Sequence, residues 1–84
     1  MMEENSQNEV VCTVDISEGM LDNEFTFYQD GRIKRYYDKN NFNYNITNWV
    51  SFNQIRESHK IKILEKLEGD LKERIKNVLY PSND

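Results

Sequence analysis

The stretch FTFYQDGRIKRYY, residues 25–37, decides the fold because it contains two strand-like segments around one turn. Aromatic and β-branched residues, which favour strands, stand on both sides of the turn. Between them lies Asp30-Gly31, a dipeptide typical of a tight hairpin connection. The stretch therefore predicts a β-hairpin over residues 24–38.

The loop length of this hairpin determines which side chains share a face. A two-residue turn at Asp30-Gly31 would pair Gln29 with Arg32 and would mix lysine with phenylalanine on one face. A three-residue loop, residues 29–31, instead puts Gly31 in the left-handed bulge position and pairs Tyr28 with Arg32. This loop separates a mostly apolar face of Phe25, Phe27, Ile33, Arg35 and Tyr37 from a face of Thr26, Tyr28, Arg32, Lys34 and Tyr36. Because that separation is the cleaner one, we predict the three-residue loop.

A first strand is predicted before the hairpin. Small apolar residues occupy every second position there: Val10, Cys12, Val14 and Ile16. Such alternation is typical of a strand with one buried face. We expect Cys12 to be a buried hydrophobe, because a reactive thiolate needs nearby positive charge and the flanking residues are acidic.

A further strand is predicted after the hairpin. Asn40-Asn41 suits a turn, and Phe42, Tyr44 and Ile46 then alternate with polar residues. The strand can continue through Trp49 and Val50. Trp49 is expected to anchor the core where the sheet meets the helix.

The last third of the chain predicts a helix. Ser51 with Gln54 three residues later matches a capping box for a short turn ending at Ile55, and Ser58 is a second candidate cap. Apolar residues then recur every three or four positions: Ile61, Leu64, Leu67, Leu71, Ile75, Val78 and Leu79. This spacing favours one helix over residues 59–79, ended by Pro81. The alternative is a break at Gly69, with Asp70 and Glu73 capping a second helix.

These elements predict an α+β fold, in which an antiparallel meander of three or four strands packs against a C-terminal helix. We expect one domain over residues 9–80, with a disordered tail at residues 1–8 and a C-terminal tail at residues 81–84.

Composition excludes several classes of site. One cysteine cannot form an intrachain disulfide, and one cysteine with one histidine cannot form an ordinary zinc site. The sequence contains no glycine-rich phosphate loop and no nucleophile elbow, and His59 is expected to be exposed beside a helix cap. We therefore expect no enzyme, no catalytic residue, no metal and no cofactor.

Location is inferred from the N-terminus and the apolar runs. The first residues, MMEENSQNE, are acidic and polar, whereas a signal peptide needs a basic flank and an apolar run. No apolar run approaches the ~20 residues of a membrane span. We expect a cytoplasmic protein with no membrane partner.

Charge is divided unevenly along the chain, whose net charge is −4. Residues 1–31 hold 8 acidic residues and no Lys or Arg, whereas residues 32–84 hold all 11 Lys and Arg and 7 acidic residues. Such a split can mark an interaction surface or can let the two halves attract each other within the fold. We favour attraction within the fold.

The function predicted from the sequence is a small non-enzymatic protein-binding module. It would act as an inhibitor or adaptor that occupies a surface of a larger protein, as a phage-encoded inhibitor of a host nuclease does. The predicted partner-binding residues are those of the second hairpin face: Tyr28, Arg32, Lys34 and Tyr36. Tyrosine and arginine are enriched at the energetic centres of protein interfaces.

Two alternatives stay open. The same face could bind nucleic acid, because aromatic rings stack on unpaired bases while cations hold phosphates. A pI near 5 and the acidic first third work against this alternative. Self-association through the bare face, giving a homodimer, is the other.

Overall fold

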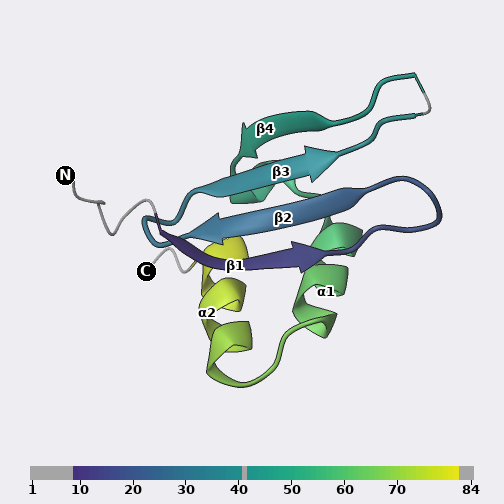
Figure 1. Ribbon diagram of the computed structural model, residues 1–84. Coiled ribbons are helices and arrows are strands. Elements are labelled where there is room, and N and C mark those ends of the chain that lie inside the picture. The colour runs from purple at the N-terminus through teal and green to yellow at the C-terminus, as the bar shows by residue number, and fades with distance from the viewer. Residues whose placement is uncertain (1–8, 41, 82–84) are drawn as a thin grey trace.

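The computed structural model describes residues 9–40 and 42–81, in which a four-stranded antiparallel sheet precedes two α-helices (Figure 1). The sheet order is β1-β2-β3-β4, so every strand pairs with its sequence neighbours. The strands are β1 (Val10–Asp15), β2 (Asn23–Tyr28), β3 (Ile33–Tyr37) and β4 (Ile46–Val50). They are followed by the short 3-10 turn η2 (Phe52–Gln54), then α1 (Glu57–Glu65) and α2 (Gly69–Leu79). This architecture confirms the predicted α+β meander.

The β2–β3 hairpin has the predicted three-residue loop. Phe27 pairs with Ile33, and the N–H of Tyr28 donates to the carbonyl of Arg32 at 3.0 Å. Gly31 has φ +91°, in the left-handed region that glycine adopts without a steric cost. The turn therefore sets the register and, with it, the face on which each hairpin side chain lies.

A bulge near the start of β1 overturns the predicted burial of Val10. The register with β2 shifts between Val10 and Cys12. An extra residue on one strand interrupts the alternation, so Val10 is half exposed while Val14 and Ile16 are buried. Cys12 is half-buried and packs against the core, in partial agreement with the expectation.

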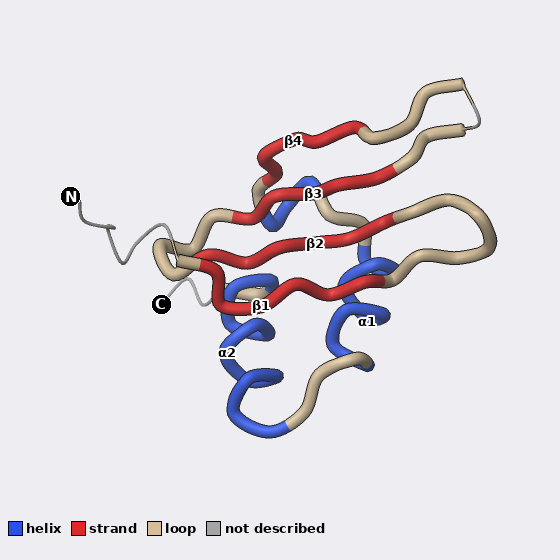
Figure 2. The backbone as a smooth tube through the Cα atoms, in the orientation of Figure 1, coloured by secondary structure: helices blue, strands red, loops and turns tan. Residues whose placement is uncertain are grey.

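The core lies between the helices and the inner face of the sheet, which is the face that α1 and α2 cover (Figure 2). Phe25, Phe27 and Ile33 of the hairpin are each at most 2% exposed. The helical segment supplies Ile55, Ile63, Ile75 and Leu79. Each fully buried side chain of this size contributes about 1.5–3 kcal/mol relative to exposure. The hairpin and the two helices thus form one apolar cluster.

Two helices replace the single helix predicted over residues 59–79. Gly69, at the start of α2, has φ +68°, and a left-handed residue cannot continue a right-handed helix. The chain turns there, and the apolar phase changes with it. Ile63, which lies off the predicted stripe, is fully buried, whereas Ile61 on that stripe is half exposed. The predicted alternative, a break at Gly69, is the correct one.

The residues at the helix starts differ from those predicted. Glu68 is the N-cap of α2, in place of Asp70 or Glu73, and Arg56 is the N-cap of α1, in place of Ser58. Neither N-cap side chain forms a capping hydrogen bond. Packing against the sheet, rather than capping, therefore determines where these helices start.

The capping box predicted at Ser51 is present and leads the chain from β4 toward the helices. In this box the N–H of Ser51 donates to Oε1 of Gln54 at 2.8 Å. The N–H of Gln54 also donates to the carbonyl of Ser51 at 2.9 Å, which is the backbone bond of the 3-10 turn. The turn ends at Ile55, as predicted, and the Ile55 side chain is buried.

The predicted tail at residues 1–8, and residues 82–84 of the predicted C-terminal tail, lie outside the described residues. Among the helices that are described, none has the length and apolar character needed to cross a membrane.

Candidate protein-binding surface

The outer face of the sheet, which points away from α1 and α2, has no helix over it in the described part of the chain (Figure 1). Strand register places Lys34 between Thr26 and Trp49 on this face. Thr13 completes the row, because it pairs with Thr26 and their hydroxyl oxygens lie 3.1 Å apart. One row of side chains therefore crosses all four strands.

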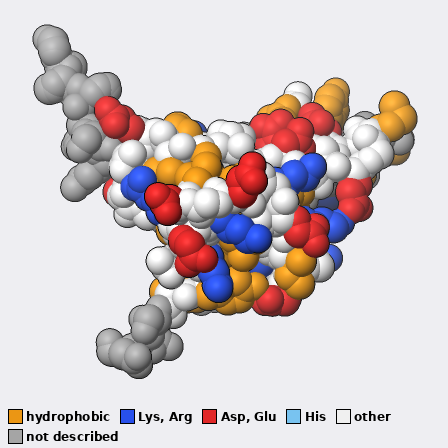
Figure 3. All heavy atoms as spheres, turned by 90° about the horizontal axis from the view of Figure 1, so that it is seen from below, with side chains coloured by type: hydrophobic (Ala, Val, Ile, Leu, Met, Phe, Trp, Pro, Cys, Tyr) orange, Lys and Arg blue, Asp and Glu red, His pale blue; other side chains and the backbone are white. Residues whose placement is uncertain are grey.

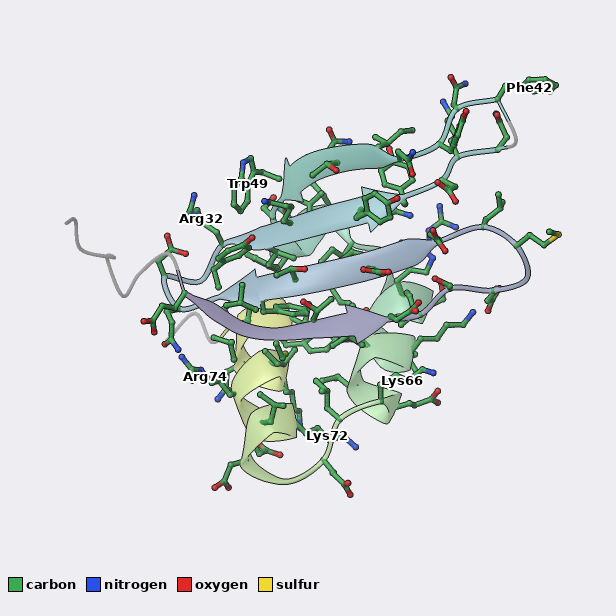
Figure 4. The ribbon with its side chains drawn as sticks, in the orientation of Figure 1. Arg32, Phe42, Trp49, Lys66, Lys72 and Arg74 are labelled. Atoms are coloured by element: carbon green, nitrogen blue, oxygen red, sulfur yellow. The ribbon has the colours of Figure 1, made fainter. Side chains whose placement is uncertain are left out.

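An aromatic–cation cluster lies at one end of the outer face and consists of Tyr28, Arg32, Lys34 and Trp49. The ring centroids of Tyr28 and Trp49 are 5.4 Å apart, with 56° between the ring planes. The Arg32 guanidinium lies 4.5 Å from the Trp49 centroid, and the Lys34 ammonium lies 4.9 Å from it. Both distances are within the ~6 Å reach of a cation–π interaction. Figure 4 shows Arg32 and Trp49 together at this end of β3 and β4.

The turn holds Arg32 in place within this cluster. Its Nε donates to Oδ2 of Asp30 at 2.6 Å, and its backbone N–H donates to Oδ1 of the same carboxylate at 3.0 Å. These bonds, the backbone one first, lower the pKa of Asp30 below its ordinary value of 3.8. The guanidinium is thus oriented before any partner arrives, which reduces the entropy lost on binding.

Tyr36 lies on the same outer face but in a different environment. It pairs with Glu24 on one side and Thr47 on the other, and its hydroxyl donates to Oδ1 of Asn45. Desolvation, followed by repulsion from nearby Asp22, Asp38 and Glu24, raises the pKa of Tyr36. The outer face therefore has a cationic end at the aromatic–cation cluster and an acidic end around Tyr36.

The structure thus gathers three of the four predicted binding residues, Tyr28, Arg32 and Lys34, and places Tyr36 apart from them. It adds Trp49, which is 52% exposed, so the expectation that Trp49 anchors the core is wrong. The physical reason is that β4 is an edge strand, and its register with β3 puts Trp49 opposite Lys34 on the outer face. Alternation in ITNWV was the available signal, because it puts Trp49 on the face opposite to Ile46 and Val50.

A polar pocket of about 290 Å³ lies where the sheet meets α1. His59 lines it together with Arg35, Arg56, Asp22 and Asp38. Partial burial, then repulsion from Arg35 and Arg56, lowers the pKa of His59 below its ordinary 6.5, so the imidazole is neutral at pH 7.

His59 is less exposed than the sequence suggested, and its ring lies 6.2 Å from the ring of Phe25. Acid–base catalysis usually pairs an imidazole with a carboxylate or nucleophile within hydrogen-bond reach. His59 has no such bond among the described residues. The expectation that the protein is not an enzyme stays a prediction.

Metal binding and thiol chemistry are the two other functions to which the remaining His, Cys, Asp and Glu side chains could contribute. Within residues 9–40 and 42–81, no group of three or more His, Cys, Asp or Glu is arranged to hold a metal ion. Burial raises the pKa of the Cys12 thiol above its ordinary 9.0, and a smaller attraction from Arg74 opposes that rise. A thiol with a raised pKa is a poor nucleophile at neutral pH.

Comparisons of this chain with protein-family models, with curated proteins and with solved structures find no match. The case for a function therefore comes from the geometry of the chain itself.

Proposed function

We propose that this protein is a small, non-enzymatic, intracellular protein-binding module that occupies a surface of a larger partner, as an inhibitor or adaptor does. The observation that carries the proposal is the aromatic–cation cluster on the uncovered face of the sheet. Tyrosine, tryptophan and arginine are the residue types most enriched at the energetic centres of protein interfaces.

The geometry of the cluster favours tight contact at a low entropic cost. Tyr28 and Trp49 are large rings with few rotatable bonds, and each is in contact with Arg32 and Lys34. Side chains that are already ordered lose less conformational freedom when a partner covers them. A partner that brings an apolar patch bordered by carboxylates would complement these four residues.

A nucleic-acid ligand is the second candidate, because bases can stack on the same two rings. The charge count disfavours it. The cluster offers two cations, Arg32 and Lys34, and Arg32 is already paired with Asp30. Contact with two phosphates gives a logarithmic salt slope of only about −1.4 for a single strand, which supports weak binding at most.

The test is a pull-down of the tagged protein from lysate of its native host, with nuclease-treated and untreated samples compared. The proposal predicts one stoichiometric protein that stays bound after nuclease treatment. Its binding should change little between 50 and 200 mM salt. Capture that disappears with nuclease would overturn the proposal in favour of the nucleic-acid candidate.

A further inference from the structure

The outer edge of β4 is an unprotected strand edge. β4 is the last strand of the sheet, and no described element pairs with its far side (Figure 1). Its sequence, ITNWV, contains no charge, no proline and no glycine. Natural sheets usually protect an edge with lysine, proline or a bulge, because open N–H and C=O groups invite pairing with another chain.

The opposite edge of the sheet is protected in the usual ways. β1 carries the bulge between Val10 and Cys12, and Asp15 stands at its end. The two edges of the sheet therefore differ, because β4 has neither a bulge nor a charged residue. Its open N–H and C=O groups are available to pair with another strand.

Exposed aromatic side chains gather around the same strand. Phe42 is 89% exposed, Tyr44 is 60% exposed, and Trp49 and Phe52 are also exposed. All four lie within one segment of eleven residues, 42–52, of which β4 is the centre. Figure 4 shows Phe42 projecting from the tip of the β3–β4 loop. Phe42 and Trp49 lie toward opposite ends of the strand (Figure 4), so these exposed rings flank the open edge and do not form one contiguous patch.

We propose that β4 pairs antiparallel with β4 of a second copy of this chain, around a two-fold axis that passes beside Asn48. A C2 axis perpendicular to the sheet keeps the helices of both copies on the same side. With Asn48 at the centre, all five residues of β4 overlap those of its copy. Ile46 then faces Val50 of the other copy, and Tyr44 and Phe52 extend the same pairing.

Charge along the outer face supports this arrangement. The cationic end, which holds Lys34 and the Asp30-paired Arg32, adjoins the Val50 end of β4, whereas the acidic end, with Glu24 and Asp38, adjoins the Ile46 end. An antiparallel two-fold pairing brings the cationic end of each copy beside the acidic end of the other. A parallel alignment would put like charges together. Neighbouring strands are about 4.8 Å apart, so the β3 strands of the two copies would lie about 14 Å apart. Beyond the ~8 Å Debye length salt screens most of this attraction, so the charges give only a weak preference for the antiparallel orientation.

The dimer would carry two aromatic–cation clusters on one continuous outer face. A partner with a repeated or two-fold symmetric surface would engage both, which raises the effective affinity without any new type of contact. The dimer can be tested separately from the proposed function. Asn48 lies on the inner side of β4, opposite Arg35, whereas the aromatic–cation cluster lies on the outer face.

The test uses two charge variants at the proposed axis, Asn48→Lys and Asn48→Asp. Asn48 is exposed, and among the described residues its side chain contacts only the Tyr37 hydroxyl, at 3.5 Å. Urea unfolding checks that both variants fold, above all Asn48→Lys, which stands opposite Arg35. At the axis each new charge faces its own copy, and like charges directly opposite each other on paired strands are unfavourable. We expect wild type to be a dimer in sedimentation equilibrium, and each variant to raise the dimer dissociation constant by up to about fivefold.

Mixing the two variants supplies the decisive result. Lysine and aspartate then face each other across the axis, so the mixture should associate more tightly than either variant alone. Thr13→Lys, on the opposite edge strand, is the control and should leave the dimer unchanged. A wild-type protein that stays monomeric up to millimolar concentration would overturn the proposal. So would a mixture that associates no more tightly than either variant alone, or a Thr13→Lys variant that disrupts the dimer as strongly.

Discussion

Lys60 shows how this small core accommodates a charged side chain. The residue is 8% exposed, and its ammonium lies 4.7 Å from the ring centroid of Tyr80 and 5.5 Å from that of Phe52. No carboxylate of the described residues forms a salt bridge with it. The aliphatic stem fills apolar space while the two rings face the charge.

Replacing Lys60 by methionine should therefore change the free energy of unfolding by less than ~1 kcal/mol, because the stem is kept and the desolvation cost disappears. Lys60→Glu should lower it by about 2 kcal/mol or more, since a buried carboxylate would face the electron-rich ring faces. Urea unfolding of the three proteins checks this. Equal losses in both variants would show that the positive charge itself is required.

His59 makes stability depend on pH between 7 and 5. Its pKa in the folded protein lies below the ordinary 6.5, so the unfolded chain binds the proton more strongly. Stability is therefore fully present above about pH 6.5 and falls as the pH drops toward the folded pKa. The carboxyl groups with lowered pKa values, Asp15, Asp30 and Asp38, act in a lower pH range, near and below their ordinary 3.8.

The measurement is the urea midpoint at pH 7, 6 and 5 for wild type and for His59→Gln. Wild type should lose stability across this range, and the variant should show a flatter dependence. If the urea midpoint of wild type rose as the pH fell to 5, the prediction would be contradicted, because a histidine whose pKa is lowered by burial and by Arg35 and Arg56 must lower stability on protonation.

At the scale of the elements, Gly69 distinguishes the two helix predictions made from the sequence: one helix over residues 59–79, or two helices with a break at Gly69. Within one continuous helix, Gly69→Ala would stabilise the protein by up to about 1 kcal/mol, because alanine is the better helix former. In the structure Gly69 has φ +68°, where an L-residue is strained by roughly 1–2 kcal/mol. We predict that Gly69→Ala lowers the free energy of unfolding by about 1 kcal/mol. An increase in the urea midpoint would contradict the break.

The sequence predicted the sheet better than it predicted the helices, for a physical reason. Strand register follows from local rules, so the loop at residues 29–31 and the face of every hairpin side chain were predictable. Which residues of two successive helices face the core depends on the turn between them. The left-handed conformation of Gly69 sets that turn, but hydrophobic periodicity does not reveal it, because a glycine can also lie within a helix at a modest cost.

The candidate site followed the same pattern. Tyr28, Arg32 and Lys34 were predictable from the hairpin alone. Trp49 was missed, although the alternation in ITNWV places it on the outer face, opposite to Ile46 and Val50. Thr47 and Trp49 are exposed because no described helix covers the outer face (Figure 1), and Asn48, on the inner side of the same edge strand, is exposed as well. Burial at the edge of a sheet is a property of the assembled molecule and not of the strand.

For the whole molecule, the acidic and basic parts of the sequence are mixed on the surface (Figure 3). The acidic first third does contact the basic remainder, as the Lys62–Glu18 salt bridge shows. Seen from below, acidic, basic and hydrophobic side chains are interspersed, with no extended field of one sign (Figure 3). Interspersed charges of this kind are an ordinary surface, so the distinctive surface is the outer face with its aromatic–cation cluster.

Two matched double variants, compared in the same pull-down, test whether the aromatic–cation cluster holds a protein partner. Trp49→Ala with Arg32→Glu removes a ring and reverses a charge within the cluster. Ile61→Ala with Lys72→Glu removes an exposed apolar side chain and reverses a charge on the helices, away from the cluster. Circular dichroism and urea unfolding confirm that both variants fold.

Truncation of residues at the energetic centre of an interface typically costs 2 kcal/mol or more, so partner capture by the cluster variant should fall by roughly tenfold or more. Capture by the helix variant should match wild type. Full capture by a folded cluster variant, or an equal loss in both variants, would contradict the assignment of the outer face as the binding surface.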